Sequence, residues 1–146
     1  MSDFIAKAEK IVRARTVHGG LENIIPYCVL GLIDIDGNPA LSAITAAKSE
    51  GIRSVCFCTG LASPKVERIK NNSKAAVCFC SEDYNISLSG RIEIITDQAV
   101  KNEMWYAPLS HHFSGPADPE YCVLKLQTER YNLLLDYREF RGTLNE

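Results

Sequence analysis

Residues 53–71 read R-S-V-C-F-C-T-G-L-A-S-P-K-V-E-R-I-K-N, and this stretch decides the fold. Together with Ile52, its first part is an apolar run ending at Thr59 that is typical of a buried strand. Gly60 breaks the strand, and Ser63-Pro64 places a hydroxyl at the helix N-cap and proline at the first helical position. The stretch therefore predicts a strand over 52–59, a tight turn and a helix over 65–70.

The start of this predicted helix also carries residues suited to binding an anion. The N–H groups and the positive dipole end of a helix attract negative charge. Thr59 and Ser63 add hydroxyl groups, and Lys65 adds a positive charge suited to phosphate. The pattern leaves two interpretations open: an ordinary capped helix with a solvated lysine, or a binding site for a phosphate group.

Short apolar runs separated by turn residues surround this segment on both sides. Asp36-Gly37 is a strong hairpin signal, and Gly90 inside a long alternating run predicts a bulge or bend. The expected strands cover residues 27–34, 41–47, 52–59, 75–81, 85–95, 121–127 and 130–136, and the expected helices cover 3–16, 65–70 and 97–106. A Pro/Gly/His-rich loop over 107–119 is long enough to suggest a functional loop, and the tail from Glu139 is polar.

Short connections between these strands favour antiparallel pairing. Closure of such a sheet into a barrel would remove its exposed edges. We therefore expect a mainly β (α+β) fold: a six- to seven-stranded antiparallel barrel with three flanking helices, forming a single domain over 1–146.

Composition and charge exclude several classes of protein. Of the 146 residues, 46% are hydrophobic and 23% charged, which is ordinary for a globular domain. The formal net charge of -2 leaves no basic surplus for nucleic acid, and no Lys/Arg run suggests a membrane surface. Residues 1–17 carry charges throughout, unlike a signal peptide, and no apolar stretch approaches the roughly 20 residues that span a bilayer. We therefore expect a cytoplasmic protein.

Four of the six cysteines form two C-x-C pairs, Cys56/Cys58 and Cys78/Cys80. Each pair lies in an apolar strand-like run, and alternation along a strand places both members on one sheet face. The favoured interpretation is a set of small buried hydrophobic side chains kept as thiols in a reducing compartment. A cysteine-based metal or redox site is the alternative, although zinc sites favour turn-borne C-x2-C spacing. We assign no metal ligand.

Several short motifs follow one another along nearly the whole chain. In order, they are the hairpin at Asp36-Gly37-Asn38-Pro39, the F-x-T-x3-S-x-K run of Phe57, Thr59, Ser63 and Lys65, Asn71-Asn72 before Ala76-Val77-Cys78-Phe79, the run from Asn85 to Gly90, Met104-Trp105, and Phe113, Gly115, Asp118 and Pro119 before Tyr121. In this order and spacing, the chain resembles the pyridoxamine 5'-phosphate oxidase-like FMN-binding split-barrel family, and most closely the branch related to general stress proteins.

The resemblance implies a split β-barrel that forms a homodimer with FMN at the subunit interface. Thr59, Ser63 and Lys65 match the phosphate-binding part of the family pattern, and residues 42–45 match the strand that runs along the flavin. Asn85 stands where relatives often carry a glutamine that touches the flavin. The candidate cofactor-binding residues are Ser42, Ala43, Ile44, Thr45, Cys58, Thr59, Ser63, Lys65, Asn85 and Trp105.

One departure from the family pattern affects the phosphate site. Many relatives carry R-P-M where this chain has Ser42-Ala43-Ile44, so an arginine that would bind phosphate bidentately is missing. Ser42, Thr45 and Lys48 could partly compensate for its positive charge and hydrogen bonds.

Two functions follow from the resemblance. The first is an FMN-dependent oxidoreductase acting on a small molecule, in which the flavin carries the redox step and the protein orients the reactants. The second is a flavin- or phosphate-ligand-binding stress or redox module without turnover. No catalytic residue is assigned. His111-His112 is interpreted as part of a polar loop or as a cofactor-edge contact, and Trp105 as a core aromatic or as a side chain stacked near the partner's flavin.

Overall fold

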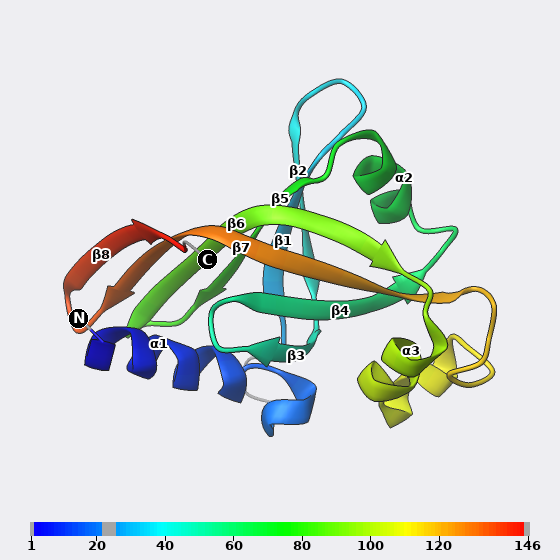
Figure 1. Ribbon diagram of the computed structural model, residues 1–146, viewed down its shortest axis with the longest axis horizontal. Coiled ribbons are helices and arrows are strands. Elements are labelled where there is room, and N and C mark those ends of the chain that lie inside the picture. The colour runs from blue at the N-terminus through cyan, green and yellow to red at the C-terminus, as the bar shows by residue number, and fades with distance from the viewer. Residues whose placement is uncertain (1, 22–25, 145–146) are drawn as a thin grey trace.

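The fold is known from a computed structural model that describes residues 2–21 and 26–144 (Figure 1). Three α-helices and two 3-10 helices flank the strands: α1 (Ser2–Ala14), α2 (Pro64–Asn71), α3 (Gln98–Met104), η1 (Val17–Gly19) and η2 (Ala107–His111). The strands are β1 (Cys28–Ile33), β2 (Pro39–Ile44), β3 (Ala46–Glu50), β4 (Ser54–Gly60), β5 (Lys74–Cys80), β6 (Tyr84–Ile95), β7 (Tyr121–Leu135) and β8 (Arg138–Thr143). No helix in these residues is long and apolar enough to cross a membrane.

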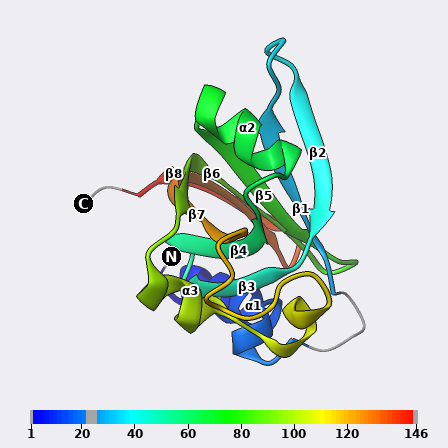
Figure 2. The same cartoon turned by 90° about the vertical axis from the view of Figure 1, so that its right-hand side faces the viewer.

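All pairings between strands are antiparallel, in the order β2-β1-β5-β6-β7-β4-β3, with β8 added on β7. The end strands of this order, β2 and β3, are consecutive in the chain and are separated only by Thr45. The sheet therefore curls until its two ends meet, as Figures 1 and 2 show from two sides. This arrangement confirms the predicted α+β split barrel, although the sheet has eight strands instead of six or seven.

The curled sheet packs two hydrophobic cores, one on each face of β4. Val55 and Phe57 point to the larger core inside the curl, which includes residues from β1, β5, β6 and β7. Cys56 and Cys58 point to a smaller core that also contains Met104 from α3. Strand alternation thus places Cys56 and Cys58 on one face, as predicted.

Strand boundaries differ from the prediction at three places. The expected return strand over 41–47 is two strands, because the chain leaves β1 at Ile44 and pairs with β4 from Ala46 onward. The expected strands 121–127 and 130–136 are one strand, β7, which pairs with β6 from Val123 to Leu135 around a bulge. The polar tail from Glu139, for which no strand was predicted, forms most of β8, after a turn in which Asp136 and Tyr137 both have positive φ.

Gly90 lies at the predicted bulge. It is paired with Thr128 and its neighbour Ser89 with Arg130, so Glu129 is the extra residue in β7. A Cβ at position 90 would lie 2.0 Å from the carbonyl oxygen of Gln127, which explains why glycine is required there. The bulge lets β7 bend without a break, and this is why it is one strand rather than two.

Helix α1 ends at Ala14, two residues before the predicted end, because Arg15 turns back into the sheet. The buried Arg15 guanidinium donates to the Tyr27 and Cys80 carbonyl oxygens at 2.8 and 3.0 Å and to the Tyr84 hydroxyl at 2.8 Å. These bonds attach the N-terminal segment to the strand ends. The third helix also ends early, at Met104 rather than near Tyr106.

Candidate functional site

The start of α2 is built as the sequence predicts. Ser63 is the N-cap, and its Oγ accepts a hydrogen bond of 3.2 Å from the Lys65 backbone N–H, while Pro64 occupies the first helical turn. A cavity of about 410 Å³ opens beside Ser63 and runs along α2 to Lys70. The N-cap therefore borders a space that is large enough to hold a phosphate group.

The backbone N–H groups near this helix start already have partners within the chain. The N–H groups of Leu61, Ser63 and Val66 donate to the carbonyl oxygens of Glu120, Gly60 and Ser63 at 2.8–3.0 Å. An anion here would therefore be held mainly by side chains and by the dipole of the helix, rather than by unsatisfied N–H groups.

Sequence reasoning missed Glu120, which also lies at this turn. Its Oε2 accepts a 2.7 Å hydrogen bond from the Ala62 N–H and would lie 3.1 Å from a Cβ added at Gly60. The contact joins residues 58 positions apart, and no local pattern indicates it. A carboxylate thus stands beside the group of residues predicted to bind phosphate.

Thr59 and Lys65 keep their polar groups available. Within the described part of the chain, the Thr59 hydroxyl has no hydrogen-bond partner and the Lys65 ammonium forms no ion pair. Both side chains are half-buried, and Thr59 lies directly before Gly60 at the end of β4. Together with the Ser63 hydroxyl, they supply two hydroxyl donors and one cation at one end of the sheet.

The strand predicted to run along the flavin presents its side chains in two directions. Ala43 pairs with Val29 on the outer face of the sheet, whereas Ser42 pairs with the buried Leu30 on the inner face. Ile44 packs against the larger core. The Thr45 hydroxyl donates to the Pro26 carbonyl oxygen at 3.3 Å.

Cys58 and Trp105 come together in the smaller core. The Cys58 Sγ lies 3.5 Å from the Tyr121 hydroxyl and donates to the Met104 carbonyl oxygen at 3.6 Å. The Trp105 ring packs edge-on against the Tyr121 ring, with 5.3 Å between centroids. Burial raises the pKa of Cys58 to about 12, so its side chain is a neutral packing group.

Asn85 lies in another part of the sheet. It pairs with Cys80 on the exposed outer face, and its Oδ1 accepts a hydrogen bond of 3.1 Å from the Cys78 Sγ. Strands β1 and β5 lie between the strand of Ala43, β2, and the strand of Asn85, β6. At the usual strand spacing, β2 and β6 are therefore about 14 Å apart. Within one copy of the chain, the predicted residues are therefore spread over several places. Besides those around the turn into α2 and those on the outer face, Cys58 and Trp105 lie in the smaller core, and Ser42 and Ile44 lie on the inner face of β2.

The two C-x-C pairs differ in their exposure. Cys56 is buried, but Cys80 is exposed and Cys78 is half-buried, so the prediction of buried hydrophobic side chains is wrong for Cys80. The described residues contain no group of three or more His, Cys, Asp or Glu side chains placed to hold a metal ion. His111 and His112 are both exposed at the end of η2.

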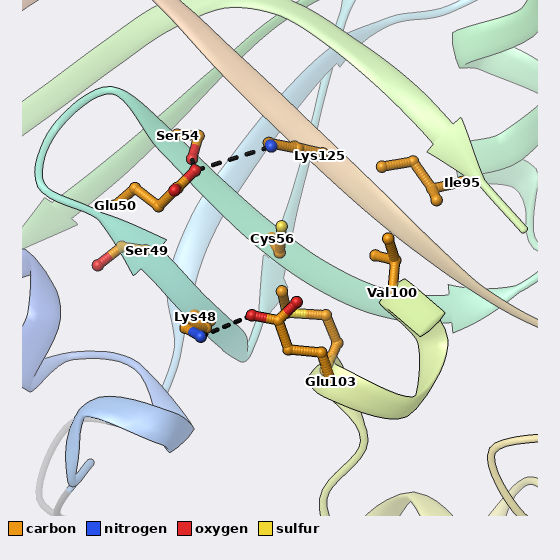
Figure 3. Close-up of a pocket in the computed structure, with 10 residues that line it drawn as sticks. Lys48, Ser49, Glu50, Ser54, Cys56, Ile95, Val100, Glu103 and Lys125 are labelled. Atoms are coloured by element: carbon orange, nitrogen blue, oxygen red, sulfur yellow. Dashed lines mark hydrogen bonds and ion pairs between the residues drawn. The ribbon is translucent and has the colours of Figure 1, made fainter. Parts of the chain in front are cut away.

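A cavity of about 150 Å³ between α3 and strands β3, β4 and β7 was not predicted (Figure 3). Two ion pairs face it: Lys48 with Glu103 at 2.7 Å, and Lys125 with Glu50 at 3.7 Å. The hydrogen bond from Lys48 lowers the pKa of Glu103. In the described structure, the charge of Lys48 is therefore shared with Glu103.

The family is decided by a comparison of the sequence with protein-family models. The model of pyridoxamine 5'-phosphate oxidase matches residues 22–135, most of the chain. The chain belongs to the pyridoxamine 5'-phosphate oxidase family. No curated protein matches the chain.

Solved structures with the fold of this family come from several organisms. A protein related to general stress protein 26, from Clostridium acetobutylicum, is 22% identical with a TM-score of 0.80, covering 99% of this chain and 96% of its own. A pyridoxamine 5'-phosphate oxidase-related, FMN binding protein from Nostoc punctiforme is 16% identical with a TM-score of 0.70, covering 97% and 96%. A heme binding protein from Mycobacterium smegmatis is 16% identical with a TM-score of 0.72, covering 96% and 57%. At these identities, the similarity establishes the fold that the family members share.

Proposed function

We propose that this protein binds FMN and uses it to oxidise or reduce a small molecule in the cytoplasm. The observation that carries the proposal is the Lys65 ammonium, which has no ion-pair partner among the described residues and belongs to the first turn of α2, shortly after the hydroxyl residues Thr59 and Ser63. An unpaired cation beside two hydroxyls is chemically suited to a phosphate monoester. Membership of a family with an FMN-binding relative selects FMN among such ligands.

We propose that the site is completed by a second copy of the chain. The outer sheet face exposes Tyr27, Val29, Leu41 and Leu134, and 72% of the Leu41 surface is open. Such a group of large apolar side chains is typical of an interaction surface. A homodimer through this face would cover them and bring the Asn85 group of one copy toward the phosphate-binding group of its partner.

The residues present fit a phosphate group, but with less positive charge than the family pattern supplies. Ser42 replaces the arginine, Lys48 is paired with Glu103, and Glu120 places a carboxylate at the turn before α2. Lys65 is then the principal cation of the site. We expect FMN to bind more weakly than in relatives that carry the arginine.

When bound, FMN supplies the electron transfer, and this chain's residues hold and orient it. Lys65 and the two hydroxyls hold the phosphate, and the half-buried position of Thr59 limits access of water to that end. Trp105, packed against Tyr121, supplies a rigid aromatic edge near the surface. A flavin-binding module without turnover is the second candidate function, because the same residues would hold the cofactor in either case.

The absorbance spectrum of the purified protein tests the proposal. A yellow protein whose released cofactor has the mass of FMN supports flavin binding, and bleaching by a reduced nicotinamide nucleotide with recovery in air supports an oxidoreductase. If the protein binds FMN but a reduced nicotinamide nucleotide does not bleach it, the result supports a flavin-binding module without turnover. A protein that neither retains nor takes up FMN contradicts both, and a monomer by light scattering contradicts the shared site.

A further inference from the structure

The long loop before β7 packs against the turn that leads into α2, and Gly60 lies where the two meet. A Cβ at position 60 would lie 3.1 Å from the Glu120 carboxylate and 3.5 Å from the Phe113 ring. Residues from both ends of the segment 113–120 therefore contact the turn. A functional loop was predicted over 107–119, and these contacts connect it to the proposed phosphate site.

Glu120 holds the turn by accepting two hydrogen bonds. Its carbonyl oxygen accepts from the Leu61 N–H at 2.8 Å, and its carboxylate accepts from the Ala62 N–H at 2.7 Å. The turn links Thr59, near the end of β4, with Ser63, the N-cap of α2. The position of Glu120 therefore fixes the backbone that joins these two hydroxyl residues.

Asp118 in turn fixes the backbone of Glu120. One carboxylate oxygen of Asp118 accepts from the Glu120 N–H at 2.9 Å, and the other accepts from the Ser114 N–H and hydroxyl at 2.9 and 3.3 Å. Bonds of this kind from an Asp side chain to nearby N–H groups stabilise turns. The bonds from the Ser114 and Glu120 N–H groups lower the pKa of Asp118, which favours the charged form that accepts all three bonds.

A buried lysine holds the backbone of the same aspartate. Lys101 of α3 is only 4% exposed, and its ammonium donates to the Asp118 carbonyl oxygen at 3.0 Å and lies 5.4 Å from the centre of the Tyr121 ring. Within residues 2–21 and 26–144, no carboxylate forms an ion pair with it. Burial of an ammonium group without a carboxylate is unfavourable compared with burial of an apolar side chain. Lys101 is therefore better explained by its bond to the loop than by packing.

We propose that Asp118 and Lys101 are positioning residues of the phosphate site, which act through Glu120 on the turn between β4 and α2. Their effect on ligand binding presupposes the FMN phosphate site proposed above. Removal of a negative charge near a bound phosphate should tighten binding, because like charges repel. Loosening of the turn should weaken binding. The direction of the change on loss of Asp118 therefore separates a positioning role from simple charge repulsion.

Affinities for FMN and for riboflavin, measured by quenching of flavin fluorescence, test these roles because riboflavin lacks the phosphate. We expect Asp118→Ala to weaken FMN binding roughly three- to tenfold, through loss of the bonds that hold Glu120, and to leave riboflavin binding unchanged. Lys101→Met should act in the same direction. Asp118→Asn removes the same charge but keeps an oxygen that can accept from the Glu120 N–H, so it should recover most of the FMN affinity. Asp3→Ala, which removes an exposed carboxylate at the start of α1, is the control and should change neither affinity.

Two results would overturn the positioning role: FMN binding in Asp118→Ala that is at least as tight as in the unchanged protein, or equal losses of FMN and riboflavin affinity. Hydrogen exchange of the Leu61 and Ala62 amides tests the role without a ligand. Exchange should be faster in Asp118→Ala and Lys101→Met, and unchanged rates would overturn the role. If the unchanged protein binds neither flavin, the proposed function fails and the exchange rates alone decide. Asp118→Asn and Lys101→Met serve if Asp118→Ala does not fold.

Discussion

The Glu120 carboxylate accepts a hydrogen bond from the Ala62 backbone N–H at 2.7 Å, at the turn that leads into α2. A phosphate bound beside Ser63 would be repelled by this charge. Glu120→Gln removes the charge and keeps an oxygen acceptor for the Ala62 N–H. We expect FMN affinity to rise roughly three- to tenfold, on the order of 1 kcal/mol for a partly exposed charge.

Quenching of FMN fluorescence measures this affinity. Glu129→Gln is the control, because it removes an equal charge at the bulge of β7 rather than at the turn. If Glu120→Gln binds FMN no better than the unchanged protein, Glu120 does not compete with the phosphate.

Lys65 is the principal cation of the proposed phosphate site, so Lys65→Ala should weaken FMN binding strongly. Loss of a hydrogen bond to a charged group corresponds to about 1.5–3 kcal/mol, or roughly 10- to 150-fold in Kd. Equilibrium dialysis with FMN checks this, with Lys10→Ala, an exposed lysine of α1, as control. If the two variants had the same FMN affinity, the phosphate group would not bind at the start of α2.

Local sequence signals predicted the parts of this structure that local interactions determine. Ser63-Pro64 specified the start of α2, and Asp36-Gly37 specified the hairpin between β1 and β2. The missed features depend on distant partners. Strand β8 forms because Asp136 and Tyr137 both adopt positive φ, which the common Asn-Gly and Asp-Gly signals do not include.

The candidate site shows the same division. Thr59, Ser63 and Lys65 are close in sequence, and the strand end, the N-cap and the helix start lie where the sequence predicted them. Glu120 enters from the far side of the long loop, and the pairing of Lys48 with Glu103 joins residues 55 positions apart. A single sequence contains no local pattern for contacts of this kind. The carboxylate of Glu120 at the site and the pairing of Lys48 with Glu103 could therefore be found only from the structure.

Gly90 provides a test of the bulge. Gly90→Ala places a Cβ 2.0 Å from the Gln127 carbonyl oxygen, so the backbone of β6 or β7 must shift. Overpacking of this kind costs about 1–3 kcal/mol, which should lower Tm by roughly 2–4 °C for each kcal/mol. Thermal unfolding followed by circular dichroism measures it, with Gly115→Ala as control because a Cβ there meets nothing within 4 Å. Equal Tm values in the two variants would mean that the bulge accommodates a side chain.

Buried thiols should make the protein less stable in mild alkali. Burial raises the pKa of Cys56 to about 11 and of Cys58 to about 12, from an ordinary value of 9.0. The unfolded chain therefore loses these protons first, and their contribution to stability is complete below pH 9 and declines as pH rises toward 11–12. Each thiol should cost about 1 kcal/mol of unfolding free energy between pH 9 and pH 10.

Urea unfolding in the presence of a reductant, at pH 8, 9 and 10, measures this decline. The double variant Cys56→Ala, Cys58→Ala should lose stability less steeply with pH than the unchanged chain, because two of the titrating groups are gone. Replacing the exposed Cys80 by Ala is the matched control and should change the slope less than the double variant does, because it acts only through its contact with Cys78. If Cys80→Ala reduced the dependence of unfolding free energy on pH as much as the double variant does, burial of thiols in the smaller core would not be the cause of that dependence.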